Sequence, residues 1–410
     1  MAEQTARVAL GESLTPIGQL RFTRAGPRQF STFSYDPAWQ EDPRGFAIQP
    51  DLALEGGPYH ASGAGGDMRD ALAGVFMDAA PESWGRRLLE RAYGAGLSEF
   101  DYLTLSDDHS RQGALRFLDA DGKIIRGPSP ESVPRLIDLE ALTAIARAYE
   151  QGRDISIEDL RALAGAGGSG GARPKANVQD GDVLWLAKFT SVLDQQPVER
   201  VEVATLTLAR ACGIRAPDTR LELAATSFPV ALIRRFDRRA GARIPYISAR
   251  TALGKSASEL GAYTEIVDFM RTFASDPEEN FRELYRRLIF TILVSNKDDH
   301  LKNHGFLYVG DGRWRLSPMF DVNPAPDRNP HLETAIMEGG PHDRSIKLAF
   351  EACGFFEIAE EEAREIIRQI ATLIRAEWRG ALQRVGVSGS LAREYEPAFA
   401  HDELEAALAI

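Results

Sequence analysis

Two aspartates and an asparagine at fixed spacing constrain this chain more than any other feature. Asp298 and Asn303 are separated by four residues, and Asp321 follows beyond a likely hairpin. In catalytic loops of this spacing the aspartate accepts the proton of a substrate hydroxyl and the asparagine holds magnesium. Asp321 is expected to be a second metal-binding carboxylate. Phosphoryl transfer from ATP needs such a set, because the γ-phosphoryl group must be held in line and its charge neutralised.

A lysine inside an apolar segment is the second candidate. Residues 183–189 predict a strand on which Lys188 shares a face with Leu184 and Leu186. Burying an unpaired ammonium group is costly, so the lysine needs a partner. It is expected to hold nucleotide phosphates, and the alternative is an edge-strand lysine in water.

Two glutamates in the predicted helix that follows could orient this lysine. Glu202 is the first choice as partner of Lys188, and Glu199 is the second. The alternative is that both form an acidic first turn that suits the helix dipole and needs no partner.

A glycine-rich run precedes the lysine strand at residues 164–175. Backbone N–H groups of such a run can cradle phosphates. It is not a Walker A loop, because Ala176 follows Lys175, and a flexible linker is the alternative. Ser169 is its one hydroxyl residue.

Two further clusters have competing interpretations. Asp298, Asp299, His300 and His304 could form a metal-hydrolase site, but neither the spacing to Asn303 nor the lysine strand would then be explained. For His300 the residue pattern favours a satisfied structural histidine beneath the loop. Five arginines form a basic cluster: Arg234, Arg235, Arg238, Arg239 and Arg243. Arg238 and Arg239 could contact phosphate, but we favour the alternative of a solvated, ion-paired loop.

Composition limits the remaining classes. The net charge of −12 argues against a protein that coats nucleic acid by bulk electrostatics. Cys212 and Cys353 are far apart and predict buried thiols in a reducing cytoplasm. The N-terminus lacks the apolar run of a signal peptide, and no segment is apolar for long enough to span a membrane.

Several motifs, in order along nearly the whole chain, resemble the HipA family of bacterial serine/threonine kinases, the toxins of type II toxin–antitoxin pairs. In the N-terminal part they are residues 33–37, 78–86 and 113–117. In the kinase part they are residues 170–175, Lys188, Glu202, residues 235–238, 296–303 and 316–321.

The resemblance implies a role for each matching position. Asp298 corresponds to the catalytic aspartate, Asn303 and Asp321 to the magnesium ligands, and Lys188 to the ATP lysine. The phosphate loop would comprise Gly170, Gly171, Ala172, Arg173, Pro174 and Lys175, and the adenine-binding hinge Arg234, Arg235 and Phe236. Arg234 stands where a glutamate is common. The implied nucleotide-contacting set also includes His300, and Ser169 lies close to the position that family members autophosphorylate.

The implied fold is α+β and protein-kinase-like, with two lobes. Residues 1–130 would form a HipA-type N-terminal subdomain, residues 131–236 a mixed α/β N-lobe, and residues 237–410 a mainly helical C-lobe.

The implied activity is that of a Mg²⁺- and ATP-dependent serine/threonine protein kinase that inhibits growth. Some family members phosphorylate aminoacyl-tRNA synthetases. The implied partner is a HipB-like helix-turn-helix antitoxin, through which operator DNA would be bound, and no membrane is involved. The alternatives are a kinase-shaped regulator that binds nucleotide or antitoxin without transfer, a small-molecule kinase, and a metal-dependent phosphohydrolase.

Overall fold

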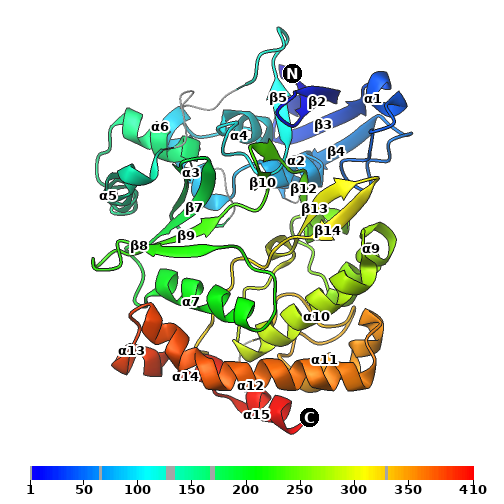
Figure 1. Cartoon of the computed structure of the whole chain (residues 1–410). Helices are drawn as coiled ribbons and strands as arrows, with labels where there is room; N and C mark the ends of the chain where they lie inside the picture. The colour runs from blue at the N-terminus through cyan, green and yellow to red at the C-terminus, as the bar shows by residue number, and fades with distance from the viewer. Residues whose placement is uncertain (1, 64–66, 126–133, 167–170, 328–330) are drawn as a thin grey trace. The chain divides into compact units, whose positions relative to one another are not determined.

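The computed structural model describes residues 2–63, 67–125, 134–166, 171–327 and 331–410 (Figure 1). The chain divides into two compact units, each formed by segments that are distant in sequence. The first comprises Met1–Val192, Arg234–Glu259 and Gly310–Gly312. The second comprises Leu193–Ile233, Leu260–Val309 and Arg313–Ile410.

A five-stranded antiparallel sheet begins the first unit, with strand order β4-β3-β2-β1-β5. The strands are β1 (Ala2–Leu10), β2 (Thr15–Ala25), β3 (Arg28–Tyr35), β4 (Tyr59–Gly63) and β5 (Leu115–Leu118). Alternate residues of β3, from Gln29 to Tyr35, are buried, as expected for a strand with one face on the core.

Helices pack on this sheet through aromatic side chains. Phe76 of α2 lies 5.3 Å from Phe33 of β3 and 6.1 Å from Phe117 of β5, measured between ring centroids. The elements here are α1 (Pro37–Glu41), η1 (Met68–Ala71), α2 (Gly74–Ala79), α3 (Ser83–Tyr93) and α4 (Glu99–Leu105). Pro81 lies between α2, which ends at Ala79, and α3, which begins at Ser83.

The rest of the first unit carries the glycine-rich segment and the lysine strand. Two antiparallel strands, β6 (Lys175–Asp180) and β7 (Val183–Phe189), form a hairpin. Around them lie η2 (Leu136–Asp138), α5 (Leu139–Glu150) and α6 (Ile157–Ala166), and α6 packs against α3. The segment from Arg234 adds β10 (Arg238–Arg239), β11 (Ala242–Arg243), β12 (Tyr246–Ser248) and α8 (Ala249–Ala252).

The second unit is mainly helical. Its strands are β8 (Thr219–Glu222), β9 (Val230–Arg234) and the hairpin of β13 (Gly305–Gly310) with β14 (Arg313–Leu316). Its helices are α7 (Val198–Ala211), α9 (Tyr263–Phe273), α10 (Pro277–Leu293), η3 (Leu301–Asn303), α11 (Ile346–Glu351), η4 (Cys353–Phe356), α12 (Glu360–Arg384), α13 (Gly389–Glu394), α14 (Glu396–Phe399) and α15 (Asp402–Ala409). The long helix α12 packs against α7, α10 and α15. The hairpin expected before Asp321 is therefore present.

Parts of the predicted organisation remain untested. The expected linker at residues 128–134 lies almost wholly outside the described residues. The three predicted domains also remain a prediction, because compactness alone divides the chain in two. Among the described residues, no helix is long and apolar enough to cross a membrane.

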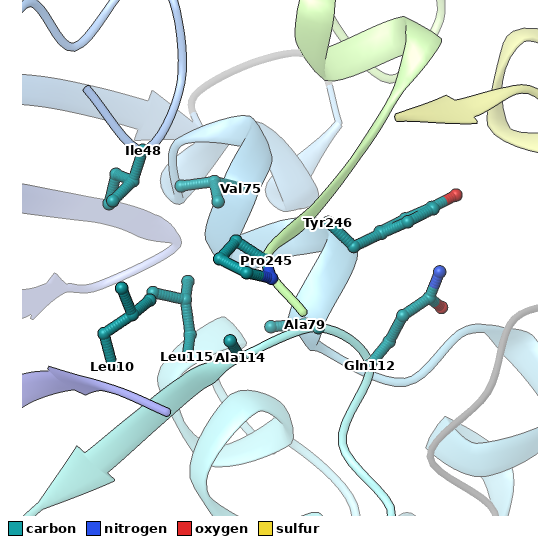
Figure 2. Close-up of a pocket in the computed structure, with 10 residues that line it drawn as sticks. Leu10, Ile48, Val75, Ala79, Gln112, Ala114, Leu115, Pro245 and Tyr246 are labelled. Atoms are coloured by element: carbon teal, nitrogen blue, oxygen red, sulfur yellow. The ribbon is translucent and has the colours of Figure 1, made fainter. Parts of the chain in front are cut away.

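A small cavity lies inside the first unit (Figure 2). Its volume is about 10 Å³, room for no more than about one water molecule. Leu10, Ile48, Val75, Leu115 and Pro245 contribute apolar side chains to its wall. A nucleotide cannot enter a space of this size, so this cavity is part of the core.

The same substitution to alanine is expected to have opposite effects on stability at two glycines. A Cβ at Gly18 would meet the carbonyl oxygen of Ser34 and approach the Phe33 ring to 2.8 Å. At Gly380 in α12 it would meet only the flexible side-chain ends of Arg384 at 3.4 Å and Glu377 at 3.9 Å. We expect Gly18→Ala to lower the free energy of unfolding by about 1–3 kcal/mol through overpacking. Gly380→Ala should raise it by about 0.5–1 kcal/mol because alanine favours the helix. Urea unfolding of both variants tests this, and a stabilised Gly18→Ala would contradict the packing described.

Candidate active site

The loop that follows α10 presents one aspartate to solvent and fixes one asparagine. Asp298 is exposed, whereas Asn303 is only 7% exposed. The amide nitrogen of Asn303 donates to the backbone carbonyl of Asp298 at 2.8 Å. Within the described residues, no side chain or backbone donor bonds the Asp298 carboxylate or the amide oxygen of Asn303. Both oxygens are therefore available to a substrate or a metal.

Asp321 lies in a strained conformation on a second loop. Its φ of 56° is in the left-handed region, which residues other than glycine seldom adopt and which often marks functional sites. Asn323 donates from its side-chain nitrogen to Oδ1 of Asp321 at 3.0 Å. The carboxylate is thus oriented by a neighbour two residues away.

Hydrogen bonds join these two loops at both ends. At one end, Asn323 N–H donates to Oδ1 of Asn296 at 3.1 Å, and Ala325 N–H donates to the carbonyl of Ser295 at 3.0 Å. At the other end, Ser317 N–H donates to the carbonyl of Gly305 at 2.7 Å. The segment with Asp298 and Asn303 and the segment with Asp321 consequently form one local structure within the second unit.

A buried carboxylate anchors the first loop. Asp299 is 2% exposed, accepts a hydrogen bond from the hydroxyl of Tyr263 and lies with its Oδ1 3.2 Å from Nε2 of His304. Burial raises the pKa of Asp299, but His304 and the Tyr263 hydroxyl outweigh it, so this pKa lies below its usual range. Thr334 donates to the Asp299 carbonyl at 2.6 Å. Asp299 is therefore an ionised structural residue.

This pairing argues against the metal-hydrolase interpretation. Asp299 and His304 are buried against each other and against Tyr263, so they do not face a shared metal with Asp298. Among the described residues, no group of three or more histidine, cysteine, aspartate or glutamate side chains suits a metal ion. His300 is half-buried, and its buried Nδ1 has no partner in the described part of the chain. It is thus not the satisfied structural histidine expected.

The ligands on these two loops fit magnesium. Mg²⁺ prefers a few hard oxygen ligands together with water and substrate phosphates. The amide oxygen of Asn303 and the carboxylate of Asp321 are of this kind, and the bond from the Asn303 nitrogen to Asp298 fixes the direction of that amide. These two residues would hold the ion, which would neutralise phosphate charge there.

Lys188 belongs to the first unit and is buried. It is 6% exposed on β7, opposite Lys175 of β6 in the hairpin register. The alternative of an edge lysine in water is therefore wrong. Glu199 and Glu202 lie on α7 of the second unit and are each 1% exposed, so they are not a solvated acidic turn. The pairing of Glu202 or Glu199 with Lys188 remains a prediction.

The glycine-rich segment is described only from Gly171 onward. Ser169 and Gly170 lie outside the described residues. From Gly171 the chain passes through Ala172 and Arg173 to Pro174, whose carbonyl accepts from Phe189 N–H at 2.9 Å, and to Lys175, the first residue of β6. This segment thus runs directly into the hairpin that carries Lys188.

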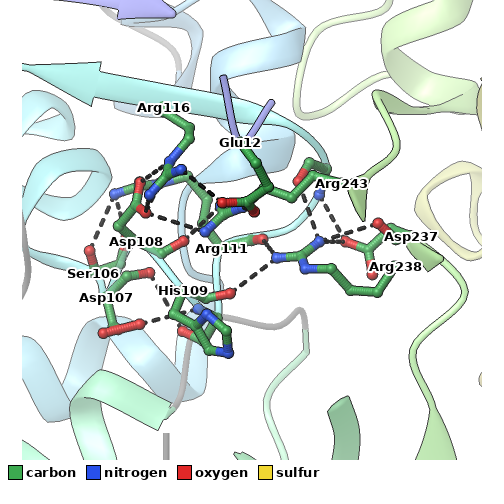
Figure 3. Close-up of polar contacts among 12 residues, drawn as sticks. Glu12, Ser106, Asp107, Asp108, His109, Arg111, Arg116, Asp237, Arg238 and Arg243 are labelled. Carbon is green, nitrogen blue, oxygen red and sulfur yellow. Dashed lines mark hydrogen bonds and ion pairs between the residues drawn. The ribbon is translucent and has the colours of Figure 1, made fainter. Parts of the chain in front are cut away.

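The arginine cluster is ion-paired, as favoured, but its central members are not solvated, since Arg243 is buried and the side chains of Arg235 and Arg238 are only 9% and 14% exposed. Asp237 is 1% exposed and contacts two guanidinium groups, that of Arg235 at 2.6 Å and that of Arg238 at 2.8 Å. Figure 3 shows the contact with Arg238. Burial raises the pKa of Asp237, but the charges of Arg235 and Arg238 outweigh it and hold the pKa below its usual range. Arg243 pairs with Glu12 at 2.8 Å and Asp108 at 3.1 Å. Only Arg234 and Arg239 are exposed.

This network fixes the expected adenine hinge, residues 234–236. The Arg235 guanidinium also donates to the side chain of Asn177 at 2.7 Å and to the carbonyl of Ser110 at 3.1 Å. Its backbone N–H donates to the carbonyl of Leu184 at 3.0 Å. The side chain of Arg235 is thereby committed to structure. A contact between the hinge, including Phe236, and adenine remains a prediction.

Comparison with known protein families decides the relationship. The model of the HipA-like C-terminal domain matches residues 167–378, and that of the HipA N-terminal domain matches residues 6–115. The chain belongs to the HipA family. The predicted HipA-type α+β fold is also confirmed. The Shewanella oneidensis HipA structure, solved with HipB and operator DNA, superposes with a TM-score of 0.70 at 17% identity, covering 99% of both chains.

Two related sequences add to this comparison. A Sinorhizobium fredii protein named "Putative kinase Y4mE" is 24% identical over 329 residues, which are 74% of this chain and 75% of that protein. A Haemophilus influenzae protein named "Putative kinase" is 30% identical over 78 residues, 18% of this chain and 23% of that protein.

Sequence reasoning missed the anchoring of Asp299. The two adjacent aspartates gave one indication, because the side chains of neighbouring loop residues point in different directions. The sequence spacing did not show that Tyr263 would be the partner of Asp299. The hydroxyl belongs to the first residue of α9, 36 positions away.

Removing that hydroxyl should weaken both folding and activity. Tyr263→Phe leaves the buried Asp299 carboxylate short of one donor, which costs about 1–3 kcal/mol in the free energy of unfolding. It should also lower kcat, since Asp298 and Asn303 share the anchored loop. Tyr285→Phe is the matched control, because Tyr285 is equally buried and donates to the carbonyl of Ala349 at 3.1 Å, away from the loop. Equal kcat losses in both variants would contradict the role of Asp299.

Proposed function

We propose that this HipA-family protein is a Mg²⁺- and ATP-dependent serine/threonine protein kinase that acts as a growth-inhibiting toxin. The observation that carries the proposal is the pair of joined loops, which presents the exposed Asp298 carboxylate, unbonded within the described residues, together with the oxygens of Asn303 and Asp321. Phosphoryl transfer needs these parts and little covalent chemistry from the protein.

Each residue has a distinct role in this proposal. Asp298 accepts the proton of the substrate hydroxyl, and its exposure suits contact with a protein substrate. Asn303 and Asp321 hold the magnesium ion, which supplies charge neutralisation at the phosphates. Lys188 binds ATP phosphates, and its burial strengthens the electrostatic contribution.

The proposed partner is a HipB-type antitoxin. Its support is the full-length structural likeness to a HipA that was solved with HipB and operator DNA. Operator binding would then be a property of the complex, since this chain carries a net charge of −12.

Asp298→Asn should abolish transfer while leaving the fold intact. The carboxylate has no bond within the described residues, so its loss costs little stability, whereas loss of the proton acceptor should lower kcat about 10²–10⁴-fold. The assay follows γ-labelled ATP into protein and locates the phosphate by mass spectrometry. Asp218→Asn, at an exposed ion pair with Arg210, is the control and should keep full activity.

The same assay separates the alternatives. Bulk phosphate release without labelled protein indicates a hydrolase, and label on small molecules alone indicates a small-molecule kinase. ATP binding without any transfer, in a lysate screen as well, indicates a regulator. Any of these outcomes contradicts the proposed protein kinase, and so does full activity in Asp298→Asn.

Lys188→Met should weaken the use of ATP. The substitution keeps an unbranched chain of similar size in the buried site but removes the charge. A charge-assisted contact to phosphate is worth about 1.5–3 kcal/mol, so the KM for ATP should rise about tenfold to a hundredfold. Thermal unfolding serves as the control, and an unchanged KM with unchanged kcat would remove Lys188 from the site.

A further inference from the structure

The start of α3 meets the glycine-rich segment within the first unit. Glu82 is the N-cap residue of α3, but its side chain does not cap the helix. Instead its carboxylate accepts the backbone N–H of Gly171. These residues are 89 positions apart and fall in the regions matched by the HipA N-terminal and C-terminal domain models, respectively.

Two neighbouring residues of α3 complete this contact. Trp84, which is 1% exposed, donates from its backbone N–H to the Gly171 carbonyl at 3.2 Å and from its indole to the Lys175 carbonyl at 2.9 Å. Arg87 donates from its guanidinium to the Ala172 carbonyl at 2.8 Å. Four hydrogen bonds from one helix end therefore hold three residues of the described part of the segment.

The conformation that these bonds hold requires glycine. Gly171 has a φ of +94°, and a Cβ there would lie 2.5 Å from Nζ of Lys175. Lys175 itself is 3% exposed. Glycine adopts this conformation without steric cost, but it adopts many other conformations equally well, so glycine alone does not fix this one. Selection must come from outside the segment, and the bonds from α3 provide it.

We propose that the N-terminal domain belongs to the nucleotide site, with Glu82 as a positioning residue for the glycine-rich segment. This inference rests on the proposed ATP-dependent activity. An ionised acceptor makes the bond to the Gly171 N–H about twice as strong as a neutral one. Glu82 thus sets the segment before ATP arrives, and the ordering cost of binding falls.

The same contact has a competing interpretation, which predicts a different effect of removing Glu82. A carboxylate on a loop N–H occupies a place that a phosphate oxygen could take. If Glu82 competed with phosphate, its removal would improve ATP binding. If Glu82 positions the segment, its removal weakens ATP binding.

The test compares Glu82→Ala, Glu82→Gln and Glu90→Ala with the unmodified chain. Glu90→Ala removes the same charge from the same helix, but the Glu90 carboxylate accepts a hydrogen bond from the Tyr102 hydroxyl rather than from the segment. The measurements are the KM and kcat for ATP, the Kd of a non-hydrolysable ATP analogue, and amide hydrogen exchange at residues 171–175 without nucleotide.

The positioning role predicts a KM and an analogue Kd about fivefold to twentyfold higher in Glu82→Ala, with kcat changed less than twofold and faster exchange at residues 171–175. Glu82→Gln retains a neutral acceptor oxygen, whose bond is about half as strong, and should recover part of both effects, while Glu90→Ala should resemble the unmodified chain. Unchanged or tighter analogue binding, or unchanged exchange, would overturn the inference. If the unmodified chain transfers no phosphate, the proposed function fails, yet analogue binding and exchange still decide the role of Glu82.

Discussion

The candidate chemistry depends on a buried carboxylate that is not itself a reactive group. Asp299 is enclosed by Tyr263 and His304, and a buried ion survives only where such partners compensate for lost water. Because Asp299 points inward, the next residue along the chain, Asp298, is left exposed at the loop surface. Two adjacent residues of the same type thus acquire opposite roles from burial alone, one holding the loop and the other available to a substrate.

In the first unit, too, a buried carboxylate with compensating partners lies beside the expected adenine hinge. Asp237 is buried against Arg235 and Arg238 and accepts the backbone N–H of Gly113 at 2.8 Å. Since Gly113 lies two residues before the start of β5, one carboxylate joins the N-terminal sheet region to the segment after β9. Together with the contact from Glu82 to Gly171, this makes the N-terminal region a structural support for the expected nucleotide-binding segments rather than an appendage.

Much of this organisation is readable from the sequence because it is local. The apolar period of α10 and α12, the turn between β13 and β14, and the spacing of Asp298 with Asn303 all concern residues close together in the chain. The missing parts are contacts across long separations, such as Glu82 with Gly171 and Asp299 with Tyr263. Charge pattern alone also did not predict that most of the arginine cluster is shielded from solvent, since it does not reveal that Asp108 and Asp237 are buried beside it.

A crystal structure with Mn²⁺ and a non-hydrolysable ATP analogue would test the site most directly, because anomalous scattering locates the metal independently of activity. The predicted result is a manganese ion bound by the amide oxygen of Asn303 and the carboxylate of Asp321, with the analogue's phosphates on its remaining positions and Asp298 unliganded. A metal bound instead by Asp299 and His304, or an analogue bound far from Asn303 and Asp321, would contradict it.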